Sequence, residues 1–284
     1  MSLLLLALWG GVAEAGPWTR GFGEHYVKLG SDTYLPFRFE DPVRGVVDDT
    51  YVGELISAYG EVGLTPGHPI QLTASVPLSI GVVNFEREQG GIDVTGTATV
   101  VRVGDIRLGL QTALLPPRIA PVAVGVEFKI PGYANDSVGQ DEGTWQTVFP
   151  RPGDGQLDMT VWLLGGTSFL GGKGWVEAWL GYRWRSSIFM GWTVDEDFVD
   201  FADSIPFRLT VGGRVGPALL MGQVDGWVNA VREDLTREAI SVGPAVLVDV
   251  YKTLAIEGRV GVEPWALKGA QGVSVGVGLS WRSN

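Results

Sequence analysis

The sequence predicts an all-β fold, a closed antiparallel transmembrane β-barrel of about twelve strands arranged as an up-and-down meander. Three observations predict it. Apolar and polar residues alternate along many segments, short turns alternate with longer loops, and the 284-residue chain combines 42 glycines with 45% hydrophobic residues. This length suits one large β domain, and no linker divides the chain.

Strict alternation is the central observation, because it puts successive side chains on opposite faces of a strand. Between Ile70 and Val82 every even-numbered residue is apolar, whereas the odd-numbered positions are mostly polar. Residues 105–114, 122–130 and 273–282 repeat the pattern. Further strands are predicted at about 22–39, 51–64, 156–168, 174–186, 204–215, 218–231, 238–250 and 253–264.

Connections of two lengths alternate along the chain. Short turns are predicted near 65–68, 116–118, 171–173, 215–217 and 252–253. Longer loops are predicted near 40–50, 84–102, 131–155 and 187–203, with shorter ones at 232–237 and 265–271. Short periplasmic turns and longer external loops are typical of outer-membrane barrels, so both chain termini are expected on the periplasmic side.

Alternation alone does not distinguish a membrane barrel from a soluble sandwich, which would bury its apolar face. Two features favour the membrane. Ionisable residues stand deep within strands on the polar face, and aromatic residues such as Trp184, Trp265 and Trp281 stand near strand ends, where a bilayer interface favours such rings. In hydrocarbon, only a closed sheet leaves no unpaired edge. The soluble sandwich stays open as the alternative.

Residues 1–15 predict a secretory signal peptide, because an apolar stretch ends in the small-x-small site Ala13-Glu14-Ala15. We expect cleavage after Ala15, a mature barrel domain over 16–284, and location in the bacterial outer membrane. The expected partners are outer-membrane lipid, the outer-membrane assembly machinery and a small-molecule solute. A net charge of −11 makes nucleic acid a poor partner, and the chain has no cysteine.

The charged residues of the predicted lumen form the candidate site. They are Arg107, Glu127, Lys129, Asp158, Glu177, Arg183, Arg208, Asp225, Glu257 and Arg259. Hairpin geometry predicts three cross-strand pairs, because opposite charges across a ladder attract: Arg107 with Glu127, Arg208 with Asp225, and Asp158 with Arg183. Two interpretations stay open. The pairs neutralise one another inside a partly filled barrel, or they line a narrow pore that selects polar or zwitterionic solutes.

No catalytic residues and no cofactor are expected. His25 shares the parity of its apolar neighbours and is predicted to face outward near the periplasmic rim, and His68 lies in a predicted tight turn. Neither stands in an obvious nucleophilic arrangement with Ser and Asp. An outer-membrane lipid hydrolase stays open as a less favoured alternative.

Two acidic loops are predicted on the external side. The denser one carries Asp195, Glu196, Asp197, Asp200 and Asp203. Such carboxylates suit a hard cation like calcium, but their spacing matches no EF-hand, so a solvated loop is the favoured interpretation and no metal centre is expected. The other, at 131–155, contains Asp136, Asp141 and Glu142 and is expected either to fold into the lumen as a plug or to stay on the surface.

Two segments resemble a known family. Gly104-Asp105-Ile106-Arg107-Leu108-Gly109-Leu110, followed by Val124-Gly125-Val126-Glu127-Phe128-Lys129-Ile130-Pro131-Gly132, resembles a hairpin of the outer-membrane meta-pathway phenol-degradation or transporter-like proteins, and 59–65 resembles a strand of related barrels. The resemblance implies an outer-membrane barrel that handles small organic or hydrophobic compounds, without catalytic residues. The function we expect is porin-like passive passage of small organic solutes. A structural or surface-interaction barrel with a closed lumen is the alternative.

Overall fold

The computed structural model describes residues 18–41, 45–47, 50–89, 92–115, 121–132, 156–189, 202–231, 238–267 and 270–283. The predicted signal peptide over 1–15 lies outside these residues, as do most of the 131–155 loop and the acidic run from Asp195 to Asp200. No helix within the described ranges is long and apolar enough to cross a membrane, a result that carries no information about crossing by strands.

The described chain is almost entirely strand. Its elements are β1 (His25–Asp41), β2 (Gly45–Val47), β3 (Thr50–Gly63), β4 (Ile70–Gln89), β5 (Ile92–Val103), β6 (Asp105–Ala113), β7 (Val122–Pro131), β8 (Gln156–Phe169), the short 3-10 helix η3 (Leu170–Gly172), β9 (Gly174–Phe189), β10 (Ser204–Val215), β11 (Ala218–Asn229), β12 (Glu238–Tyr251), β13 (Leu254–Leu267) and β14 (Ala270–Arg282).

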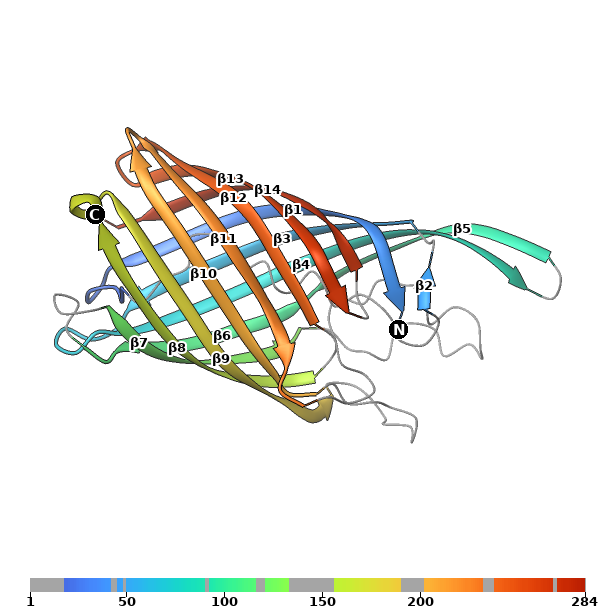
Figure 1. The fold of residues 1–284 in the computed structure, drawn as a ribbon, viewed down its shortest axis with the longest axis horizontal. Helices are drawn as coiled ribbons and strands as arrows, with labels where there is room; N and C mark the ends of the chain where they lie inside the picture. The colour runs from blue at the N-terminus through green and yellow to red at the C-terminus, as the bar shows by residue number, and fades with distance from the viewer. Residues whose placement is uncertain are drawn as a thin grey trace.

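Neighbouring strands pair antiparallel in chain order, and β14 pairs with β1, so the sheet closes. Within the described residues the wall has twelve strands, because β2 and β5 lie off the ring. Figure 1 shows the strands tilted around a common axis. The predicted closed meander is therefore confirmed. Tyr26 on β1 is the register partner of Arg282 on β14, so the barrel begins and ends at the same rim.

The prediction of a loop at 84–102 is wrong. β4 continues to Gln89 and pairs there with β5, and the two strands extend together beyond the barrel rim (Figure 1). β6 then pairs with the first half of β4. The exchange from β5 to β6 occurs at Gly104, whose N–H donates to the carbonyl of Pro77 on β4 at 2.8 Å. Pro77 has no N–H for the ladder, which suits a point where pairing is interrupted.

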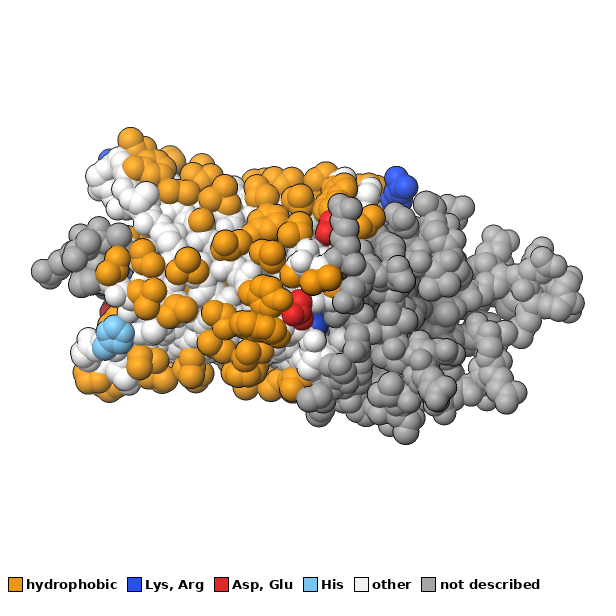
Figure 2. Space-filling model, turned by 60° about the horizontal axis from the view of Figure 1, so that its bottom comes forward, with side chains coloured by type: hydrophobic (Ala, Val, Ile, Leu, Met, Phe, Trp, Pro, Cys, Tyr) orange, Lys and Arg blue, Asp and Glu red, His pale blue; other side chains and the backbone are white. Residues whose placement is uncertain are grey.

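The two faces of the wall separate as the alternation predicts. Val277 and Leu29 are 64% and 58% exposed, whereas Lys28, next to Leu29, is 5% exposed. Hydrophobic side chains cover the visible outer surface of the barrel in Figure 2. The apolar face therefore points outward and the polar face points into the lumen, which is the opposite of a soluble sandwich.

Candidate functional site

The charged residues predicted for the lumen all lie on the inward face of their strands. Six of them are buried, namely Lys129, Asp158, Glu177, Arg183, Glu257 and Arg259. The other four are partly buried and line the central cavity: Arg107, Glu127, Arg208 and Asp225. Burying an ionised side chain is costly unless it is paired, so the partners of these groups decide what the lumen can hold.

One of the three predicted cross-strand pairs has the predicted register. Arg208 on β10 lies directly opposite Asp225 on β11. Arg107 forms the predicted ion pair with Glu127, with Nη1 2.9 Å from Oε1, but it does so diagonally. Its direct register partner is Lys129, because the β6–β7 ladder is centred one residue later than the sequence suggested.

The third predicted pair, Asp158 and Arg183, interacts electrostatically but lies diagonally across the ladder. The residue opposite Asp158 on β9 is Arg185, with its Nε 3.6 Å from Asp158 Oδ2. Arg183 lies opposite Thr160 instead. The turn 170–173 contains four residues, including η3, and this shifts the β8–β9 register relative to a tighter turn. Lys129 completes the group, with its Nζ 2.8 Å from Asp158 Oδ2 and 3.7 Å from Asp105 Oδ2.

A second group of charges closes the barrel between β1 and β13. Lys28 Nζ lies 2.7 Å from Glu257 Oε1. Arg259 binds Asp32 through Nε and Nη2, so that both carboxylate oxygens accept. Hairpin reasoning missed these partners of Glu257 and Arg259, because they lie more than two hundred residues away on the first strand. Their inward parity on β1 is the only sequence signal that marks them.

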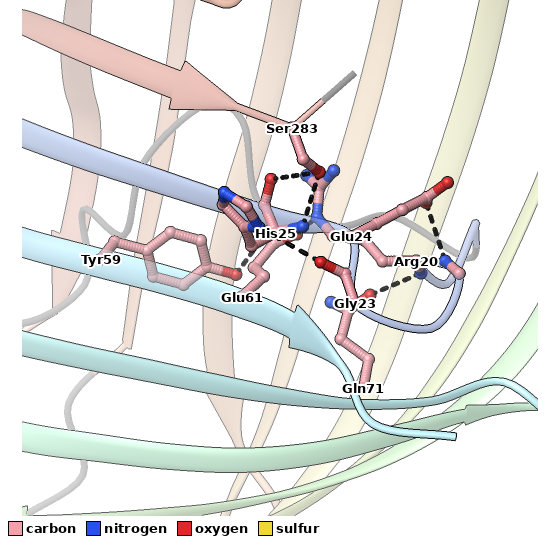
Figure 3. Close-up of polar contacts among 9 residues, drawn as sticks. Arg20, Gly23, Glu24, His25, Tyr59, Glu61, Gln71 and Ser283 are labelled. Atoms are coloured by element: carbon pink, nitrogen blue, oxygen red, sulfur yellow. Dashed lines mark hydrogen bonds and ion pairs between the residues drawn. The ribbon is translucent and has the colours of Figure 1, made fainter. Parts of the chain in front are cut away.

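The chain just before β1 lies against the ends of β3 and β4 at one rim of the barrel (Figure 3). Arg20 donates from its backbone N–H to Gln71 Oε1 at 2.8 Å and from Nε to Glu61 Oε2 at 2.5 Å. Both acceptors belong to buried, inward-facing side chains of β4 and β3. Phe22 adds a backbone bridge to Gly63. The segment 20–24 therefore narrows this end of the barrel.

A cavity of about 100 Å³ lies in the middle of the lumen and touches walls from β1 to β11. Its inward-facing aromatic side chains are Tyr59, Trp162, Trp179 and Trp227. Trp162 and Trp179 meet edge to face with their ring centroids 5.8 Å apart, and Arg208 stacks 5.1 Å from the centroid of Trp179. This internal aromatic surface was not predicted from the sequence, although Trp162 and Trp179 stand at inward-facing positions of their strands.

Comparison with known proteins supports this architecture. No family model matches the sequence, and no curated protein matches it. An outer membrane channel from Pseudomonas putida F1 matches the structure with a TM-score of 0.69 and 12% identity, covering 95% of this chain and 100% of that one. The chain has the fold of an outer-membrane β-barrel. This confirms the fold and the bacterial outer-membrane location that the sequence predicts, with lipid as the medium around its apolar face.

Two further solved structures resemble the chain more distantly. The CymD monoaromatic hydrocarbon channel has a TM-score of 0.47 and 11% identity, covering 93% of this chain and 90% of that one. The translocator domain of the autotransporter NalP from Neisseria meningitidis has a TM-score of 0.46 and 12% identity, with the same two coverages.

The histidines and the acidic loop have ordinary structural surroundings where they are described. The ring of His25 packs 4.6 Å from that of Trp281, and His68 Nε2 lies 2.8 Å from Thr112 Oγ1. Asp203 accepts hydrogen bonds from Tyr182 Oη and the Arg185 N–H, both at 2.8 Å. Its carboxylate therefore fixes the chain before β10 to β9. No metal-binding group occurs among the described residues.

Proposed function

We propose that the barrel is a channel for passive passage of small organic solutes across the outer membrane, and that it is not an enzyme. The observation that carries this proposal is the cavity inside the closed wall, which is lined by opposing charges and aromatic rings from many strands. Charged rings in a narrow pore select among solutes by attraction and repulsion. A wall built only to hold the barrel together would not need such a cavity.

Planar bilayers test the proposal directly. Purified full-length protein should give single-channel currents, and proteoliposomes should swell in small sugars, amino acids or aromatic acids. Arg107→Ala removes one cation from the cavity wall and should shift the reversal potential toward cations. Arg214→Ala is the matched control, because Arg214 is exposed at the periplasmic rim and pairs there with Asp249. Absence of both current and swelling would contradict the proposal.

A closed barrel with a structural or surface-interaction role is the second candidate, and the segment 20–24 favours it. Arg20 fixes this segment to Glu61 and Gln71 at the rim of the barrel. Arg20→Ala combined with Glu61→Gln should release the segment. If the segment closes the lumen, this variant conducts and the wild type does not. If both conduct equally, the segment leaves an open path beside it.

Export and assembly complete the proposal. We propose cleavage after Ala15 and insertion by the outer-membrane assembly machinery, with both chain termini on the periplasmic side. Mass spectrometry of protein extracted from membranes should find Gly16 as the first residue, and an intact Met1 would contradict it. A lipid hydrolase would lose activity in the double variant His25→Ala, His68→Ala, whereas a channel should show no ester hydrolysis in either form.

A further inference from the structure

Arg183 is a buried cation of the lumen without an ion-pair partner among the described residues. It lies on β9 and is 7% exposed. Its register partners on the two neighbouring strands are Thr160 on β8 and Ser204 on β10, both of them hydroxyl residues. A buried guanidinium normally has a carboxylate within reach, because burying an unpaired cation is costly. No carboxylate lies directly opposite Arg183, and the diagonal neighbour Asp158 on β8 attracts it without forming an ion pair.

The nearby carboxylates are engaged by other cations. Glu127 pairs with Arg107 at 2.9 Å, and Asp158 pairs with Lys129 at 2.8 Å and with Arg185 at 3.6 Å. Asp105 is likewise engaged, with its Oδ2 3.7 Å from Lys129 Nζ. Across the described part of the chain, no residue forms an ion pair with Arg183. Arg183 therefore has no ion-pair partner within the described residues, and its side chain lines the cavity.

Two further polar groups on β9 and β10 lack a partner. Within the described residues, the buried Trp179 Nε1–H and the buried Ser204 Oγ have no hydrogen-bond partner. Trp179 is four residues before Arg183 on β9, and Ser204 is its register partner on β10. An indole N–H only donates, and a hydroxyl can donate. A cation without an ion pair, opposite an unpartnered Ser204 hydroxyl, fits an anion that accepts hydrogen bonds.

An aromatic surface adjoins the guanidinium. Trp162 lies opposite Gly181, which is two residues from Arg183 and shares its inward face. A Cβ at Gly181 would lie 2.8 Å from Trp162 Cε3 and 3.1 Å from Pro206 Cγ, so the absence of a side chain lets the indole lie against β9. Two strand residues span about 7 Å, which places ring and guanidinium within the length of one small molecule.

We propose that this part of the lumen is a binding site for a small aromatic carboxylate, held by Arg183 through its carboxylate and by Trp162 and Trp179 through its ring. The proposal rests on the channel function proposed above and names its substrate class. A planar guanidinium binds a carboxylate through two parallel hydrogen bonds, and aromatic rings add edge or stacking contacts. The cavity has a volume of about 100 Å³, which restricts the ligand to a small molecule.

The test uses full-length protein in detergent and sodium benzoate as the probe. Calorimetry should show benzoate binding, and benzamide, which has the same ring without the charge, should bind about tenfold more weakly or worse. Arg183→Gln should weaken benzoate binding by a similar factor and leave benzamide unchanged. Arg214→Gln, at the exposed rim, is the matched control and should bind benzoate like the wild type. Equal benzoate affinity in Arg183→Gln and wild type would overturn the proposal.

Two additions keep the result decisive. Arg183→Lys retains the charge without the planar fork and should recover only part of the affinity, which also covers the case in which Arg183→Gln fails to fold. Currents in planar bilayers separate the two proposals. Benzoate binding that depends on Arg183 in a barrel without conductance would support the site and contradict the channel. If the barrel conducts but its benzoate affinity does not depend on Arg183, the binding-site proposal is contradicted and the channel proposal is not.

Discussion

Arg259 on β13 and Asp32 on β1 form a two-point ion pair that crosses the intervening strand β14 at Gly276. Gly276 is the register partner of both residues, so the pair lies directly over its α-carbon. Lys28 and Glu257 cross the same strand beside Gly278. The seam where the last strand meets the first is therefore bridged by buried charges above small residues.

Gly276→Ala should destabilise the barrel, because a methyl group there would clash with Asp32 Oδ1 and Arg259 Nε. We expect a loss of about 1–3 kcal/mol, the usual range for overpacking. Urea unfolding in lipid vesicles measures it. Gly258→Ala is the control, since a Cβ at Gly258 would meet only Val246 Cγ1 at 3.8 Å. Equal stability of the two variants would show that the seam tolerates the added methyl.

Arg259→Met should be more damaging than the removal of both partners. The single change leaves the buried Asp32 carboxylate without its bidentate partner, which costs about 3–5 kcal/mol. The double variant Arg259→Met, Asp32→Leu removes both charges and should recover most of that loss. A double-mutant cycle of unfolding free energies checks this. Additive losses would mean that the two side chains do not interact in the folded barrel.

A charge on the outer face should be tolerated only near a rim. Val277 lies in the middle of β14 and is 64% exposed, whereas Val250 lies at the end of β12 and is 50% exposed. Val277→Arg should cost about 2–4 kcal/mol and Val250→Arg about 0–1 kcal/mol, because the penalty depends on depth in the bilayer. Unfolding from lipid vesicles measures both. Equal penalties would argue against a lipid belt centred on Val277.

The β4–β5 extension should be dispensable for the barrel. Among the described strands β5 pairs only with β4, so replacing residues 84–97 by Asn-Gly would join the paired positions 83 and 98 with a two-residue turn. We expect unchanged heat-modifiable migration on gels and an unfolding free energy within about 0.5 kcal/mol of wild type. Failure of the shortened protein to close would mean that the extension is needed for assembly.

The sequence by itself determined the sheet and the orientation of its faces. Side-chain alternation is a local property with a period of two. The sequence of each strand therefore shows which residues face lipid and which face the lumen. The inward position of Arg183 and the outward position of Val277 follow from this alternation alone. The β5 strand was missed because a hairpin beyond the rim does not meet lipid on one face, although its Val and Thr content favours a strand.

Only the tertiary structure decided which inward side chains meet. Register depends on the unpaired length of each turn, and a difference of one residue replaced Arg183 by Arg185 opposite Asp158. The pairing of β1 with β14 brings Asp32 to Arg259 across 227 residues, a contact that no hairpin rule contains. The cavity between Arg183 and Trp162 likewise exists only once the sheet is closed, because closure makes one enclosed surface from residues on separate strands.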